Sequence, residues 1–312
     1  MKYFLVLAIS VLFFNHSFAQ FNDYQVFFGR YNDELLCRKW IQNGEVFYLS
    51  INPNTLKTSI VKNIKAESLK WDEIIQQYQN TNYFKAWRFE KLKDYTLQDA
   101  GIEKSDSTLN GFSLTVDLCP STKPLDRNFF KQVIKAFEVS ELPVPITITV
   151  TGLWMKSHQS DLKWLISQEV SGNLAITWVN HSFNHHYDPK LPLRDNFLLE
   201  KGTVIANEVL LNEQAMLQNK LIPSVYFRFP GLVSSKAIFD QILSYGLLPL
   251  GSDAWLAKGQ LITKGSLVLV HANGNEPLGL KLFLSQLKKN EADIKKKAWQ
   301  LWDVSNLISK EK

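Results

Sequence analysis

From residue 111 to the C-terminus, strand-like and helix-like segments alternate, and this alternation narrows the possible folds more than any other feature of the sequence. Short runs rich in Val, Ile and Thr predict strands, and the amphipathic segments between them predict helices, the first of them capped by Asp126. Such alternation is typical of a parallel sheet or barrel, whose functional residues lie at the carboxyl ends of the strands. The predicted strands are 111–117, 145–151, 174–178, 225–228, 247–250, 267–271 and 299–304, and the predicted helices include 162–166, 203–217, 234–246 and a Lys-rich segment near the C-terminus.

Residues 20–108 have a different pattern and predict a small β-rich module in front of the α/β domain of residues 109–312. The turn Gln42-Asn43-Gly44 is a strong hairpin signal, and a helix with Ser68 as its N-cap follows the strands. The polar stretch 99–107 is the predicted linker. No catalytic grouping stands out, so the module either binds a glycan or a protein, or packs on the main domain. Its predicted strands are 24–28, 34–41, 45–51 and 58–61.

Residues 1–19 have the features of a secretory signal peptide: the positive Lys2, an apolar run over 3–14 and a small-x-small cleavage site at 17–19. They predict that the protein is secreted or periplasmic. No later run reaches the roughly 18 apolar residues that a membrane helix needs, so no integral membrane segment is expected after cleavage.

Composition places the chain among globular proteins, because 45% of its 312 residues are hydrophobic and 21% are charged. The net charge of +5 comes from dispersed Lys and Arg. The run of lysines at 295–297 is interpreted as the solvated face of a helix, so no nucleic-acid partner is expected. Cys37 and Cys119 form a disulfide or stay free, and the sequence leaves both possibilities open.

Three of the six histidines lie within residues 181–186, directly after the predicted strand 174–178. His181 and His185 are four residues apart, so one helical turn would place both imidazoles on the same side, as two ligands of one metal ion require. A surface loop of histidines without a ligand is the alternative. Their position at the end of a buried strand favours the metal site.

Other polar residues also follow predicted strands. Asp117, Arg228 and His271 each end a strand, and Asp253 follows a short turn after another. Each has an ordinary explanation when taken alone, such as a helix cap or a surface ion pair. Since the carboxyl ends of parallel strands share one edge, we expect all four to meet on one face with the histidines.

These residues belong to five motifs that follow one another along the chain: Thr115-Val116-Asp117, His181-Ser182-Phe183-Asn184-His185, Arg228-Phe229-Pro230-Gly231, Asp253-Ala254-Trp255 and Leu267-Val268-Leu269-Val270-His271. Their order resembles that of the polysaccharide deacetylases, carbohydrate esterase family 4, over about two-thirds of the chain. The resemblance implies a distorted (β/α) barrel that removes acetyl groups from an N-acetylated polysaccharide with a divalent metal, usually zinc. The roles it implies are Asp117 as general base, His181 and His185 as metal ligands, His271 as general acid, Arg228 as the partner of Asp117, and Asp253 as the residue that tunes His271.

The chain departs from the family at the first motif, where a second Asp normally binds the metal and Leu118 stands here. The metal site is therefore expected to be weakened or absent. Cys119 lies on the same side of the strand as Asp117, since side chains alternate, and is a candidate substitute ligand. His186 and Asp188 are further candidates.

Two other functions stay open: a metal-free hydrolase of another C–N bond and a catalytically inactive glycan-binding relative. The presence of an acid and a base disfavours the second. Trp154, Trp178 and Trp255 are interpreted as core residues or as sugar-stacking faces. The sequence does not indicate which glycan is bound.

Overall fold

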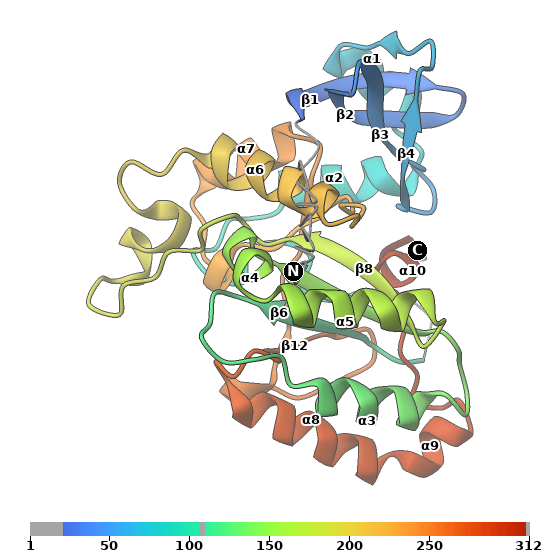
Figure 1. Ribbon diagram of the computed structural model, residues 1–312, viewed down its shortest axis with the longest axis vertical. Coiled ribbons are helices and arrows are strands. Elements are labelled where there is room, and N and C mark those ends of the chain that lie inside the picture. Colours follow the sequence, from blue (N-terminus) through green and yellow to red (C-terminus); the bar gives the residue numbers. More distant parts are fainter. Residues whose placement is uncertain (1–20, 106–109, 310–312) are drawn as a thin grey trace, which may run out of the picture.

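The computed structural model describes residues 21–105 and 110–309, and its centre is a seven-stranded parallel sheet (Figure 1). The strand order is β10-β9-β8-β7-β6-β12-β11. The prediction of a (β/α)-barrel type of domain behind a β-rich module is confirmed. The strands are β6 (Ser113–Leu118), β7 (Val144–Val150), β8 (Leu174–Asn180), β9 (Tyr226–Phe227), β10 (Leu248–Pro249), β11 (Ala254–Trp255) and β12 (Leu267–Val270).

Helices cover the outer face of this sheet, because alternate strand residues are apolar and must be buried against another layer. Figure 1 shows α3, α8 and α9 together at one end of the molecule. The predicted cap of α3 is confirmed, since the Asp126 side chain accepts a hydrogen bond from Phe129 N at 3.0 Å. The helices are α3 (Arg127–Phe137), α4 (Gly152–Ser157), α5 (Gln159–Val170), α6 (Ile205–Gln218), α7 (Lys236–Ser244), α8 (Pro277–Lys289), α9 (Glu291–Lys295) and α10 (Val304–Ser309).

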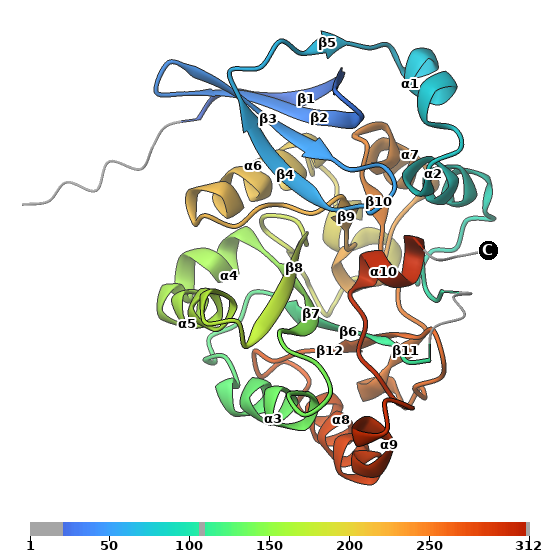
Figure 2. The same cartoon turned by 90° about the vertical axis from the view of Figure 1, so that its right-hand side faces the viewer.

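The N-terminal module is an antiparallel sheet of order β4-β3-β2-β1-β5 followed by two helices (Figure 2). The predicted hairpin turn joins β2 to β3. The predicted cap was wrong: Ser68 ends a short strand, and the helix begins after Lys70, whose backbone N–H binds Glu73 at 2.6 Å. The elements are β1 (Asn22–Tyr31), β2 (Glu34–Gln42), β3 (Glu45–Ile51), β4 (Thr58–Lys62), β5 (Glu67–Ser68), α1 (Trp71–Tyr78) and α2 (Asn82–Leu92).

The N-terminal module packs on the main domain through a shared apolar core and a buried ion pair. Arg38 of β2 is fully buried and binds both carboxylate oxygens of Glu213 on α6, at 2.7 and 2.9 Å. Tyr83 donates a hydrogen bond to Gly246 O at 2.9 Å. The predicted linker also contacts the main sheet, because Ile102 pairs with Leu250. The sequence left open whether the module binds a glycan or a protein, or packs on the main domain. The structure shows that it packs on the main domain.

The described residues also bear on three further expectations. The strand predicted at 299–304 was wrong: only Leu301 forms a bridge, to Phe112, and α10 begins at Val304. Cys37 and Cys119 are both buried and free, so they form no disulfide. No helix in the described ranges is long and apolar enough to cross a bilayer, and residues 1–19 lie outside those ranges.

Candidate active site

Asp117 lies near the carboxyl end of β6, on the side of the sheet that faces away from the outer helices. The residue is 3% exposed, and its side chain accepts a hydrogen bond from Thr149 Oγ1 at 2.8 Å. Burial opposes its ionisation, but Arg228, His181 and His271 outweigh that effect and lower the pKa of Asp117. The structure therefore presents a buried, ionised carboxylate at this strand end.

Arg228 follows β9 and is brought to Asp117, as the sequence predicted. Its Nη1 lies 3.6 Å from Asp117 Oδ1, and its Nη2 donates to Thr115 Oγ1 at 3.1 Å. The guanidinium is fully buried. Because an isolated buried charge is very unfavourable, the Arg228 guanidinium favours the ionised form of Asp117, and each group offsets the cost of burying the other.

His181 and His185 also converge, but the predicted helical turn between them was wrong. The chain leaves β8 into a loop in which Ser182 has φ 68° and His185 has φ 49°. The two rings still meet, with centroids 4.8 Å apart. His181 Nδ1 lies 2.8 Å from Arg228 O, so its Nε2 is directed toward Asp117, 3.6 Å away.

Cys119 supplies a third donor atom beside the two histidines. Its Sγ lies 3.5 Å from His181 Nε2, and the candidate ligand atoms of Cys119, His181 and His185 all lie within 4.8 Å of one another. Ligands of a tetrahedral zinc ion, each about 2.0–2.3 Å from the metal, are themselves about 3.5 Å apart. The donor set thus fits a zinc-like ion held by three protein ligands.

The electrostatics of this group also suit a metal. Burial raises the pKa of Cys119, but the surrounding imidazoles outweigh it and hold that pKa well below its usual range. A deprotonated thiolate is the form that binds metal. His185 Nε2 is buried without a hydrogen-bond partner. A buried nitrogen with no such partner is available to bind a metal ion.

The other candidate ligands do not join this group. His186 pairs with Glu200 at 2.7 Å, and Asp188 Oδ1 accepts a hydrogen bond from Lys190 N. Leu118, which replaces the family's usual second Asp, is fully buried in the apolar core between the sheet and its helices. The alternation of the strand places its side chain opposite to those of Asp117 and Cys119.

The position of Leu118 predicts the effect of restoring the missing carboxylate. Leu118→Asp would bury an unpaired charge in the core and is expected to lower the free energy of unfolding by about 3–5 kcal/mol. Chemical denaturation measures this, with Leu118→Asn as the uncharged match of equal size. A stable Leu118→Asp variant that binds metal more tightly would show instead that residue 118 reaches the site.

His271 lies just after β12, 7% exposed, and faces a carboxylate that the sequence analysis missed. Its Nδ1 forms an ion pair with Glu276 Oε2 at 2.9 Å, and Trp255 Nε1 donates to the same oxygen at 2.7 Å. Burial opposes protonation, but the Cys119 thiolate, Glu276 and Asp117 raise the pKa of His271 to about 10. The imidazole is therefore held as a cation.

The prediction that Asp253 tunes His271 was wrong. Asp253 Oδ1 accepts a hydrogen bond from Leu267 N at 2.9 Å, and its Oδ2 accepts one from Ser266 Oγ at 3.0 Å, so it braces the start of β12. Glu276 was missed because it lies five residues beyond His271, outside any motif. Its one sequence signal is Pro277, which places Glu276 at the N-cap of α8.

Four of the residues described above, Cys119, His185, His271 and Glu276, line one cleft of about 790 Å³. Trp154 and Trp178 are buried core residues, whereas Trp255 lines the cleft with Lys258 3.6 Å above its ring centre. Tyr187 also lines the cleft, is 53% exposed and stacks on Phe197 with ring centres 5.1 Å apart.

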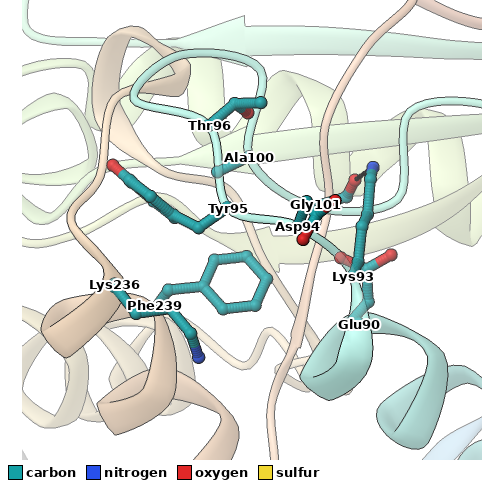
Figure 3. A pocket seen from close by; sticks show the side chains of 9 residues that line it. All are labelled: Glu90, Lys93, Asp94, Tyr95, Thr96, Ala100, Gly101, Lys236 and Phe239. Atoms are coloured by element: carbon teal, nitrogen blue, oxygen red, sulfur yellow. Dashed lines mark hydrogen bonds between the residues drawn. The ribbon is translucent and has the colours of Figure 1, made fainter.

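A separate cavity, between the end of α2 and α7, is drawn in Figure 3. It has a volume of only about 10 Å³. Tyr95, Lys93 and Phe239 are among its lining residues, and none of the candidate site residues lines it. It is too small for a substrate, whereas the cleft at the strand ends is lined by Cys119, His185 and His271 and is therefore the candidate active site.

No protein-family model matches the chain. Among solved structures, a family 4 carbohydrate esterase from Bacillus anthracis is 18% identical, covers 68% of this chain and 89% of its own, and has a TM-score of 0.47. A CE4 family pseudoenzyme from Bacillus anthracis is 11% identical, with 94% and 91% covered and a TM-score of 0.46. A family 4 carbohydrate esterase from Bacillus subtilis is 15% identical, with 78% and 91% covered and a TM-score of 0.44. All three carry the name of the family that the sequence motifs resemble.

Proposed function

We propose that this protein is an exported, metal-dependent hydrolase that removes acetyl groups from an N-acetylated glycan, as the resemblance to polysaccharide deacetylases implies. One observation carries the proposal: Asp117, His271 and the donors Cys119, His181 and His185 converge from three separate segments, and Cys119, His185 and His271 line one cleft. Export rests on the signal-peptide features of residues 1–19.

Each residue has a role that its surroundings support. A divalent ion held by Cys119, His181 and His185 would polarise the acetyl carbonyl and acidify a water molecule. Asp117 accepts the proton of the attacking water, and Arg228 keeps that carboxylate ionised between turnovers. His271 donates a proton to the departing amine, for which its raised pKa provides the protonated form.

The cleft walls favour a sugar as the substrate. The exposed face of Tyr187 is held rigid by its stacking on Phe197, and a flat, apolar sugar face packs well on such a ring. Trp255 is less open to a sugar because Lys258 covers its ring. The sugar contact is therefore assigned to Tyr187 rather than to the tryptophans.

The ion pair at His271 predicts a change in the pH dependence of the reaction. Glu276 stabilises the imidazolium, so Glu276→Gln is expected to lower the pKa of His271 and to move the alkaline fall in kcat to lower pH by about one unit or more. Rates of acetate release across pH 6–11 measure this. Asp253→Asn is the matched control and should not change the pH at which kcat falls. An equal shift in both variants would show that Glu276 does not specifically stabilise the His271 imidazolium.

Acetate release from a panel of acetylated glycans, with chelator and with added zinc or cobalt, tests the proposed function. We expect release that stops on chelation and returns with metal. The panel should include chitin oligomers, peptidoglycan and acetylated exopolysaccharide. Glycan binding without any release in the presence of metal would favour the inactive binding relative.

One observation favours a second candidate, the metal-free hydrolase. The Cys119 thiolate also lies within hydrogen-bonding reach of the His271 imidazolium, whose other nitrogen faces Glu276, an arrangement of activated nucleophile, partner imidazolium and orienting carboxylate. Such an enzyme would keep its activity in chelator and lose it on alkylation of Cys119. An acyl group found on Cys119 by mass spectrometry would establish this mechanism.

A further inference from the structure

The loop that carries His181 and His185 has an unfavourable backbone conformation. Ser182 and His185 both lie in the left-handed region, which side chains larger than glycine rarely adopt. Such conformations persist only where the surroundings hold them in place. The structure must therefore contain groups that hold this loop.

Glu208 of α6 is the principal group that does so. Its Oε2 accepts hydrogen bonds from Phe183 N at 3.0 Å and Asn184 N at 2.8 Å, and its Oε1 accepts one from the Asn184 side chain at 2.6 Å. The side chain is 6% exposed, so these charge-assisted bonds are shielded from water. One carboxylate thus binds both backbone N–H groups that lie between the two left-handed residues.

The other sides of the loop are held by α4 and by the next turn of α6. Leu153 N donates to Phe183 O at 3.0 Å. Asn212 Nδ2 donates to Asn180 Oδ1 at 2.7 Å, and that oxygen also accepts Ser182 N at 3.0 Å. Glu208 is a charged side chain that binds the loop at three points, whereas the nearby Glu200 pairs with the His186 side chain.

We propose that Glu208 is a positioning residue for the metal site, which holds His181 and His185 in the conformation that lets them share an ion with Cys119. This inference rests on the metal site of the proposed function. Glu208 does not reach the donor atoms; it acts on the backbone that carries them. Metal affinity, more than folding, should therefore depend on it.

Cobalt binding to the full chain tests the proposal, because the absorption of Co²⁺ reports both affinity and ligand geometry. Glu208→Gln keeps the shape of the side chain but replaces one acceptor oxygen by an NH₂ group. That group would face N–H groups of the loop, to which it cannot hydrogen-bond as an acceptor. We expect Co²⁺ affinity to fall about 10–100-fold, as for other residues that orient metal ligands, with an altered cobalt spectrum. Asn184→Ala changes an exposed residue and removes only the 2.6 Å hydrogen bond to Glu208. We expect this variant to lose less Co²⁺ affinity, and to fold even if Glu208→Gln does not.

Glu213→Gln is the matched control, since Glu213 is a second buried carboxylate on α6 but binds Arg38 instead of the loop. It should lower the melting temperature and leave Co²⁺ affinity and spectrum unchanged. Wild-type affinity in both Glu208→Gln and Asn184→Ala, or an equal loss in Glu213→Gln, would overturn the positioning role. Failure of the wild-type protein to bind Co²⁺ would instead overturn the metal site of the proposed function.

Discussion

Asp117→Asn is expected to lower the rate of acetate release about 10²–10⁴-fold, the usual contribution of a general base, while the protein still folds and binds metal. The amide cannot take up the proton of the attacking water, although its oxygen can still accept the hydrogen bond from Thr149. Arg228 loses its nearest opposite charge, so the variant should also melt at a lower temperature. Acetate assays and thermal denaturation measure the two effects.

Thr149→Val is the control for this experiment. It removes the 2.8 Å hydrogen bond but keeps the Asp117 carboxylate, so release should fall by no more than roughly tenfold, the equivalent of one hydrogen bond. Undiminished release by Asp117→Asn would exclude Asp117 as the base. The role would then have to pass to another group in the cleft.

Cys119→Ser is expected to reduce the bound metal and acetate release by at least about 100-fold, more than the loss of a residue that only orients a ligand. A neutral hydroxyl is a far poorer ligand than a thiolate, and two histidines would remain. Elemental analysis of the purified protein measures the metal. The Co²⁺ derivative should also lose its sulfur-to-metal charge-transfer absorption.

Two companion variants make this result specific. Cys37→Ser alters the other buried free cysteine, which donates to Leu49 O in the N-terminal sheet, and should leave metal content unchanged. Cys119→Asp replaces the thiolate by a carboxylate ligand and should recover part of the metal. Full metal content in Cys119→Ser would show that Cys119 is not a ligand and would strengthen the metal-free mechanism.

Helices and strands were predicted well where their formation depends on residues close together in the sequence. The Thr- and Ile-rich run of β7 and the Asp126 cap of α3 follow from side-chain alternation and from one hydrogen bond, both of which the sequence displays. The predictions of Ser68 as the cap of α1 and of a strand at 299–304 were wrong. In both cases the outcome depends on pairing with distant segments, such as Ser68 with Gly29 and Leu301 with Phe112.

At the site, the order of motifs predicted that Asp117, Arg228, His181 and His271 meet, and they do. It did not predict Glu276, because a side chain five residues past a motif reaches His271 only through the turn into α8. Nor did it reveal Glu208, whose hydrogen bonds link α6 to a loop more than twenty residues earlier.

The sequence by itself determined the α/β alternation and the placement of reactive residues at strand ends, since both depend on neighbours along the chain. Only the tertiary structure decided which carboxylate faces His271, that Leu118 belongs to the core, and that Cys119 lies close to both histidines. Those outcomes depend on the relative positions of strands and loops, and these are set by packing between segments far apart in the chain.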